Sequence, residues 1–339
     1  MCVRVSCAMK TGWRQCLLLA FIAAASLLGA AYMFDLHSLP PIPKNALASH
    51  QRILIGDAAE FTIPGAGTGC ECVTRGSGSF SDPFVISGWR LNASDGEGIS
   101  IARTTVHFLI VNVAVVNGSG HHGGVVLRDV ENGAITDSSF FGVRDGISLY
   151  TSSNILIANN TFLDNDFGIL LEATNNNTVA TNRLERSRQI GIFVRGSNNT
   201  VDANLVLNAS FGGINVDGTT LLGSSNSIKR NVVRGNSAYG IAAWQASNNV
   251  ISGNAVSENQ GAGIMLVDSS TNNLVEDNRV ANNVADGVLI ARQSSGNRVT
   301  RNSVTGNGNG VTTFDLHDES SNNLWLSNTF NTRRPDTIS

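Results

Sequence analysis

The sequence predicts an all-β fold, a right-handed parallel β-helix of about ten coils, and three observations support this prediction. A Gly followed by Ile or Val recurs from Gly98 to Gly310 at steps of 22 to 27 residues. The pattern Asn-x-aliphatic/Phe recurs from Asn160 to Asn328 and holds the same phase. Apolar residues alternate in runs of about four, bounded by Gly and Asn, which is typical of short strands. A regular repeat of this length indicates a solenoid.

Each repeat suits one coil of three short strands and three turns. Helical solenoids need longer repeats with a 3.6-residue period, whereas Ile169 and Leu171 follow a period of two. We expect the aliphatic residues to form one continuous core, with neighbouring coils at roughly 4.8 Å. Gly and Asn are expected at the corners because they adopt left-handed backbone angles most readily. The asparagines from Asn160 to Asn328 are expected to stack as a buried side-chain amide ladder.

An export segment is predicted at the N-terminus. Residues Cys16 to Phe34 form 19 residues without a charge, and three basic residues precede them. This length is at the lower edge of a membrane span, and the basic flank is expected to stay in the cytoplasm. A signal peptide cleaved after Ala31 and an uncleaved signal anchor both fit, and the length of the run favours the anchor. Both predict an extracytoplasmic location, at the cell surface or in the periplasm, for a membrane-anchored or secreted protein.

The domain organisation follows from these features. The predicted segments are a signal anchor or signal peptide at 1–34, a Pro-rich linker at 35–52, a β-helix domain at 53–332 and a C-terminal tail at 333–339. Pro40, Pro41 and Pro43 predict that the linker is stiff and extended. Residues 53–92 lack the repeat and are expected to form the N-terminal cap that a solenoid requires.

The composition excludes two classes of protein. Charged residues make up 14% of the chain, below the roughly 25% of typical soluble domains. Low charge with abundant aliphatic residues argues against disorder. The net charge is -3, and the sequence has no run of basic residues. Because phosphate binding needs clustered cations, no nucleic-acid partner is predicted.

One outward-facing column carries the candidate chemistry. Counting four residues beyond successive marker glycines reaches Tyr150, Glu172, Arg195, Asp217 and Trp244 on five consecutive coils. Glu172 and Asp217 lie two coils apart, roughly 9.6 Å, near the upper end of the spacing for an inverting glycosidase pair. Arg195 between them would favour both ionised forms. Such a cation suits ligand binding, or the charge neutralisation of a lyase, more than it suits a general acid.

We therefore take Glu172, Arg195 and Asp217 as candidate catalytic residues, and Tyr150 and Trp244 as aromatics that could stack on sugar rings. The alternative is an ordinary solvated column of alternating charges, which stabilises its neighbours modestly. The position two beyond each glycine also faces outward and is expected to form an apolar stripe that contacts a partner protein or is covered by a loop. That stripe reads Ser148, Leu170, Phe193, Asn215, Ala242, Met265, Leu289 and Thr312.

The evidence for a metal site is weaker. Cys70 and Cys72 are the cysteines that follow the apolar segment, and their thiolates would suit Cu(I). His121 or His122 could complete such a site, but the sequence has no C-x-x-C or H-x-x-x-H spacing. A local disulfide or free thiols fit this pattern better, so no metal or other cofactor is predicted. His317 is expected in a surface loop.

The stretch "NNTVATNRLERSRQIGIFVRGSNNTVDANLVLNASFGGINV" resembles the NosD-type β-helix repeat and the wider pectate-lyase-like superfamily. "DPFVISGW" and the ending "NLWLSNTFN" extend the resemblance to about residues 53–332. Similarity to NosD implies periplasmic copper delivery to a reductase. Similarity to the superfamily implies polysaccharide binding, lysis, hydrolysis or epimerisation. The "DPHD" motif of alginate epimerases is absent, because Phe84 follows Asp82-Pro83.

These observations favour an exported, membrane-anchored β-helix that acts as a glycan-binding, protein-binding or structural module. One alternative is a polysaccharide lyase, hydrolase or epimerase that uses Glu172, Arg195 and Asp217. Another alternative is a NosD-like copper-handling protein. Repeat motifs encode the scaffold rather than the activity, so no motif commits the chain to a reaction.

Overall fold

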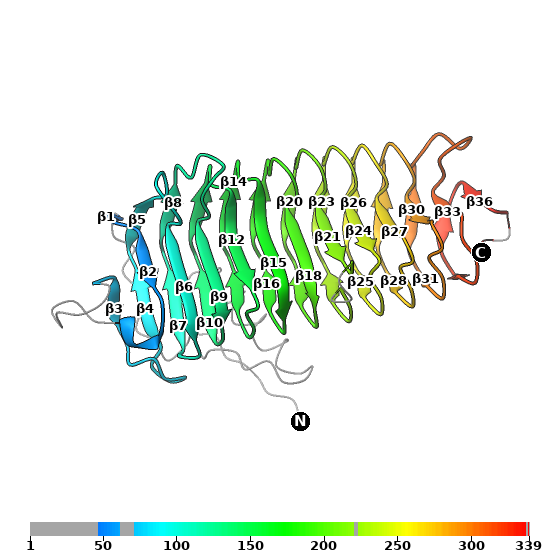
Figure 1. Ribbon diagram of the computed structural model, residues 1–339. Coiled ribbons are helices and arrows are strands. Elements are labelled where there is room, and N and C mark those ends of the chain that lie inside the picture. Colours follow the sequence, from blue (N-terminus) through cyan, green and yellow to red (C-terminus); the bar gives the residue numbers. More distant parts are fainter. Residues whose placement is uncertain (1–46, 62–70, 220–222, 337, 339) are drawn as a thin grey trace, which may run out of the picture. The chain divides into compact units, whose positions relative to one another are not determined.

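The computed structural model describes residues 47–61, 71–219, 223–336 and 338. They form a solenoid in which successive coils stack along one axis (Figure 1). This confirms the predicted all-β solenoid. The predicted membrane segment, Cys16 to Phe34, lies outside the described residues, as does most of the linker. Within the described ranges, no helix is long and apolar enough to cross a membrane.

Three sheets, each with twelve strands in the described part of the chain, wrap the solenoid. We call the first of them the site sheet because it carries the candidate column. Its strands are β2 (Ile53–Ile55), β6 (Ile99–Thr104), β9 (Val125–Val130), β12 (Asp145–Tyr150), β15 (Phe167–Asn175), β18 (Ile192–Ser197), β21 (Ile214–Asp217), β24 (Ile241–Trp244), β27 (Ile264–Val267), β30 (Val288–Ile290), β33 (Leu316–Asp318) and β36 (Arg333–Arg334).

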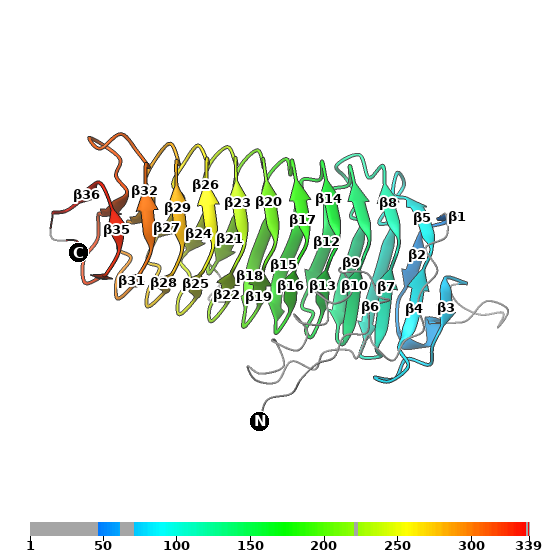
Figure 2. The same cartoon turned by 180° about the vertical axis from the view of Figure 1, so that it is seen from behind.

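The other two sheets complete each coil, and Figure 2 shows them from behind. The second sheet contains β3 (Val73–Arg75), β4 (Phe84–Ser87), β7 (Phe108–Val111), β10 (Gly133–Thr136), β13 (Leu156–Ala158), β16 (Thr178–Ala180), β19 (Thr200–Asp202), β22 (Ser227–Lys229), β25 (Val250–Ser252), β28 (Leu274–Glu276), β31 (Arg298–Thr300) and β34 (Leu324–Leu326). The third contains β1 (Ala48–His50), β5 (Trp89–Asn92), β8 (Ala114–Val116), β11 (Ser139–Phe141), β14 (Thr161–Leu163), β17 (Arg183–Glu185), β20 (Leu205–Leu207), β23 (Val232–Arg234), β26 (Ala255–Ser257), β29 (Arg279–Ala281), β32 (Ser303–Thr305) and β35 (Thr329–Phe330).

The solenoid extends beyond both ends of the predicted β-helix segment. Strand β1 lies inside the predicted linker and pairs with β5, and β36 lies inside the predicted tail and pairs with β33. The predicted cap region is irregular, because β3 pairs with β4 in antiparallel fashion. A short 3-10 helix, η1 (Ala58–Glu60), precedes Phe61, whose ring stacks on Phe84 with centroids 5.1 Å apart.

The core is the continuous aliphatic column that the alternation predicts. Ile147, Ile169 and Ile192 pair in register on neighbouring strands, and each is fully buried. Each such side chain contributes about 1.5–3 kcal/mol relative to an exposed one. The alternate positions of the same strands face outward, and this fixes the column that bears the candidate site.

The recurrent glycines are required by close packing and not, as expected, by left-handed backbone angles. The marker glycines on the site sheet up to Gly287 do not adopt left-handed angles. A Cβ atom on Gly168 would lie 2.4 Å from the Leu184 side chain and 2.6 Å from the carbonyl oxygen of Gly191. Glycine is therefore required by close packing between coils. The last marker, Gly310, was misassigned: the backbone N–H of Val288 bonds the carbonyl of Asp315, so Asp315 occupies that corner.

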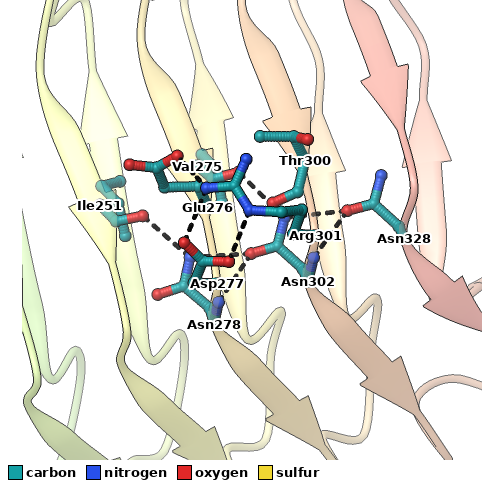
Figure 3. A network of polar contacts seen from close by, with 9 residues as sticks. All are labelled: Ile251, Val275, Glu276, Asp277, Asn278, Thr300, Arg301, Asn302 and Asn328. Carbon is teal, nitrogen blue, oxygen red and sulfur yellow. Dashed lines mark hydrogen bonds and ion pairs between the residues drawn. The ribbon is translucent and has the colours of Figure 1, made fainter.

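The asparagines hold the corners together by hydrogen bonds. The Asn182 side-chain Nδ2 donates to the Ile157 carbonyl at 2.9 Å and to Asn204 Oδ1 at 3.0 Å. The backbone N–H of Asn182 donates to the same Oδ1. Figure 3 shows the same pattern for Asn278, Asn302 and Asn328. Every polar atom of a ladder amide thus has a partner in an adjacent coil, so its burial carries no unpaired-atom penalty.

The ladder from Asn160 to Asn328 confirms the prediction, and two further ladders stand at the other corners. The residue before a ladder asparagine, not the asparagine itself, adopts the left-handed conformation, as at Thr181 and Ala203. The additional ladders are Asn177, Asn199, Asn226, Asn249, Asn273, Asn297 and Asn323, and Asn236, Asn259, Asn283 and Asn307, the latter ending on the Asp315 carboxylate.

We expect Asn249→Ala to lower the free energy of unfolding by about 2–5 kcal/mol. The change removes the acceptor for the Asn226 N–H and the donor to the Gly223 carbonyl, and a buried unpaired polar group costs about 1–3 kcal/mol. Urea denaturation followed by circular dichroism measures the effect. The neighbouring Asn248→Gly variant is the control, because Asn248 is exposed with a φ of 59° that glycine readily adopts. Equal losses in both variants would contradict a special role for the ladder.

Candidate functional site

The structure places the five candidate residues in one register on the outer face of the site sheet. Tyr150 pairs with Glu172, Glu172 with Arg195, and Asp217 with Trp244. The register extends one strand further toward the N-terminus, where Tyr150 pairs with Arg128. We call the six residues Arg128, Tyr150, Glu172, Arg195, Asp217 and Trp244 the charged column.

Arg195 joins the two candidate carboxylates. Its Nη1 lies 3.0 and 3.1 Å from the two oxygens of Glu172, and its Nη2 lies 2.8 Å from Asp217 Oδ2. The guanidinium also lies over the Phe193 ring, 5.2 Å from its centroid. Two carboxylates share one cation, so the local formal charge of this triad is about -1 at neutral pH.

Arg195 is the least exposed arginine among the arginine ion pairs of the described residues. Arg301, for example, bonds Asp277 and Glu276 at an outer corner (Figure 3), and its side chain is 50% exposed. The Arg195 side chain is 27% exposed and that of Asp217 11%. Exposed pairs contribute about 0–1 kcal/mol, whereas half-buried ones are more strongly coupled. The triad is therefore more than a solvated row of alternating charges.

Asp217 is held as a carboxylate. Burial by itself raises its pKa, but hydrogen bonds from Arg195 and from the Thr219 backbone N–H outweigh this, and the pKa lies below its usual value. A general acid needs a raised pKa. Asp217 thus suits ligand binding, or a role as a base or electrostatic stabiliser, and does not suit proton donation.

The two aromatic ends of the column differ in their surroundings. The Arg128 guanidinium lies over the Tyr150 ring, 5.5 Å from the centroid, and Arg128 also pairs with Glu97 at 3.2 Å. Burial and the nearby Asp145 charge raise the pKa of Tyr150. Because a cation covers one face of this ring, only its other face is available to stack on a sugar.

At the other end, Trp244 belongs to an aromatic cluster that sequence analysis missed. Tyr239 lies in the turn before β24, 6.4 Å from Trp244 and 5.5 Å from Phe211 between ring centroids. Burial and the charge of Asp217 raise the pKa of Tyr239 well above its usual value. Phe211 is 49% exposed. Tyr239 lies in a turn. The alternation along a strand predicts which side chains line up on neighbouring coils, but it makes no such prediction for a turn residue.

The predicted apolar stripe, two residues beyond each marker glycine and called the apolar column from here on, is less exposed than predicted. Ser148 and Ala242 are fully buried and Asn215 is 7% exposed, while Leu170 and Met265 are half-buried. None of the large exposed apolar residues of the described chain belongs to this column. Such a surface does not present the exposed patch that a protein partner would need. The assignment of Thr312 as the last member of this stripe was wrong, because His317 is the residue that pairs with Leu289.

Three polar atoms on this face are buried without a hydrogen-bond partner. They are Arg195 Nε, Asn215 Oδ1 and Trp244 Nε1, from the adjacent strands β18, β21 and β24. Buried polar atoms are nearly always paired, so each exception calls for an explanation. Two donors and one acceptor on neighbouring strands match the bonding pattern of alcohol hydroxyl groups, which both donate and accept.

His317 was expected in a surface loop, and this expectation was wrong. It lies in β33, is 7% exposed, and its Nδ1 lies 3.0 Å from Asp286 Oδ1. Its ring also contacts Phe314 edge-on, with centroids 5.2 Å apart. Burial raises the pKa of Asp286, partly offset by the bonds from Phe314 N–H and His317. In the sequence analysis this coil is counted from Gly310, whereas the coil begins at Asp315. His317 is therefore a strand residue, two positions beyond the true corner.

The described residues do not fit a copper centre. No group of three or more His, Cys, Asp or Glu side chains in the described ranges is arranged to hold a metal. Cys72 is disulfide-bonded, and Cys70 lies outside the described residues. Since Cu(I) binds thiolates, a disulfide-bonded Cys72 offers no copper ligand, in line with the disulfide alternative of the sequence analysis.

Comparison with protein families supports the fold seen in the structure. Residues 167–330 match the family described as the right handed beta helix region. Residues 76–220 match the family described as periplasmic copper-binding protein (NosD), a match that begins after Cys72. Both matches agree with the three-sheet parallel solenoid of the structure, so the fold is that of a right-handed parallel β-helix. A comparison with curated proteins gave no match.

Solved structures share this fold. The periplasmic alginate epimerase AlgG has a TM-score of 0.57 and 16% identity, over 72% of this chain and 76% of that one. The A-module of Azotobacter vinelandii mannuronan C-5 epimerase AlgE6 has a TM-score of 0.60 and 13% identity, over 74% and 84%. The tailspike of E. coli bacteriophage HK620 bound to a pentasaccharide has a TM-score of 0.53 and 14% identity, over 71% and 55%. Identities this low establish a common fold and nothing about activity.

We expect Asp217→Asn to destabilise the protein by about 1–2 kcal/mol at pH 7, a value reduced for solvent screening of Arg195. Folding lowers the pKa of Asp217, so its charge stabilises the folded state above the ordinary carboxyl pKa of about 4. That contribution is lost as the pH falls through the lowered pKa. Thermal unfolding between pH 2 and pH 7 should show the two proteins converging below about pH 4.

The control for this titration is Asp82→Asn, which changes an exposed carboxylate of the cap. As a substitution at an exposed site, it should change the free energy of unfolding at pH 7 by no more than about 0.5 kcal/mol. A gap between native protein and Asp217→Asn that widens on acidification would contradict the assignment of Asp217 as the stabilising carboxylate.

Proposed function

We propose that this protein is an exported glycan-binding β-helix whose site is the charged column on the site sheet. The observation that carries the proposal is the set of unpartnered polar atoms on Arg195, Asn215 and Trp244. Arg195 belongs to the half-buried ion triad and Trp244 to the aromatic cluster, so these atoms join the two groups on one face. Sugars present hydroxyl groups beside apolar ring faces, so they need hydrogen-bonding groups next to aromatic surfaces.

The fold supports this proposal without deciding it. The HK620 tailspike, which shares the architecture, was solved with a pentasaccharide. Parallel stacking gives such a site a regular spacing of roughly 4.8 Å per coil, so side chains of successive coils line one long contact surface. A polymer can lie across several coils at once and gain many weak contacts.

Catalysis by Glu172, Arg195 and Asp217 is the second candidate, and the carboxylate pair favours it. Against it, Asp217 is held ionised, and Arg195 occupies the space between the carboxylates. An inverting hydrolase needs a protonated acid and room for a water molecule. Binding is therefore the better supported function, and polysaccharide lysis, hydrolysis or epimerisation is the outcome that turnover assays would reveal.

An extracytoplasmic location accompanies the proposal. The uncharged stretch from Cys16 to Phe34 predicts export. The family matched by residues 76–220 and the AlgG epimerase are both described as periplasmic. We infer that the solenoid faces the periplasm or the cell exterior, where polysaccharides are encountered. Copper handling stays unsupported because the described residues offer no ligand set.

We expect Trp244→Ala to weaken glycan binding at least fivefold, about 1 kcal/mol, because truncating a central aromatic residue at an interface commonly costs that much or more. The full chain would be screened on a glycan array, and affinities would then be measured by calorimetry. The control is Phe141→Ala, which removes a 45% exposed aromatic side chain from the third sheet. If Trp244→Ala binds glycan as tightly as the native protein, the site lies elsewhere on the solenoid. Binding of the native protein to no glycan would refute the proposal.

A further inference from the structure

We propose that Asn215 forms a hydroxyl-binding subsite and that the glycan it receives is uncharged. The inference rests on the proposed glycan-binding function and specifies both a residue and a ligand class. Asn215 points outward from β21 between Phe193 and Ala242, its partners on the neighbouring strands. On the same strand, Asp217 of the ion triad pairs directly with Trp244 of the aromatic cluster, so Asn215 lies beside both groups.

The bonding of Asn215 differs from that of the buried ladder asparagines. Ladder members such as Asn204 and Asn231 have their side-chain oxygen bonded by the coil before. Asn215 is 7% exposed, yet its Oδ1 accepts no hydrogen bond. An unsatisfied buried acceptor reduces stability by about 1–3 kcal/mol. Because a leucine of similar size would avoid this penalty, an asparagine here indicates a ligand that donates to it.

The neighbours of Asn215 indicate hydroxyl groups. Trp244 Nε1 and Arg195 Nε are donors that also lack partners. Hydroxyl groups both donate and accept, so the hydroxyls of one sugar can donate to Asn215 Oδ1 and accept from these N–H groups. The χ2 torsion of an asparagine side chain is broad, so a side-chain rotation can turn the buried amide toward a bound sugar.

Electrostatics excludes an anionic sugar at this place. The arginines along this part of the face are already paired: Arg128 with Glu97, Arg144 with Asp145, and Arg195 with both Glu172 and Asp217. A uronate carboxylate would find no free cation in this group and would approach a triad with an excess negative charge. Like charges in a partly buried site repel strongly. A neutral sugar meets no such barrier.

The test combines affinity with stability. The full chain would be titrated with dextran, laminarin and galactomannan as neutral probes, and with alginate and polygalacturonate as acidic probes. Asn215→Leu is the test variant, and Met265→Leu, two coils away in the same apolar column, is the control. We expect a neutral probe to bind at least tenfold tighter than either acidic probe, and Asn215→Leu to weaken that binding at least fivefold.

The melting temperature of Asn215→Leu should equal or exceed that of the native protein, because the change removes an unpaired buried acceptor. A structural asparagine would show the opposite. Preferential binding of an acidic probe would overturn the inference and leave the glycan-binding function intact. Native affinity for a neutral probe in Asn215→Leu would also overturn it. Binding to neither set of probes would refute the inference together with the proposed function.

Discussion

The hydrogen bond between asparagine amides of successive coils is the interaction on which this solenoid depends. Strands of three residues make few backbone bonds, and each coil must turn three times. At the corners that carry a ladder, an Asn Oδ1, such as that of Asn204, accepts both the backbone and the side-chain N–H of the coil before. Turns that would otherwise bury unpaired amides are thus satisfied by a single residue type. The low charge content of the chain follows, because polarity is supplied by amides inside the structure.

Because the core and the corners hold the coils together, the outer face of the site sheet is free to vary in sequence. Inward positions must be apolar, and corner positions are occupied mostly by asparagine, glycine or serine. The outward positions can therefore carry chemistry without disturbing the fold. The outward positions of the site sheet use that freedom: Arg195 bonds two carboxylates, while Asn215 and Trp244 keep unsatisfied polar atoms. Residues that do not optimise stability stand out most clearly against a scaffold this regular.

Sequence reasoning succeeded where periodicity alone determines the outcome. The register that aligns Tyr150 through Trp244, and the ladder that begins at Asn160, follow from counting. It failed where an insertion breaks the count, as at Gly310, and where a side chain in a turn packs across coils, as for Tyr239. It also gave the wrong reason for the marker glycines. The sequence of one repeat does not reveal close contact between coils, because the atoms that would clash with a Cβ atom belong to a different repeat.

The ladders also give the solenoid an electric polarity. In every ladder the amide oxygen faces the preceding coil and the nitrogen faces the following one, as Asn182 shows between Asn160 and Asn204. Three parallel rows of aligned dipoles resemble, in side chains, the macrodipole that a helix builds from its backbone. The positive end of each row lies toward the C-terminal coils. One row terminates there on the carboxylate of Asp315, so a negative charge meets the positive pole of the stack.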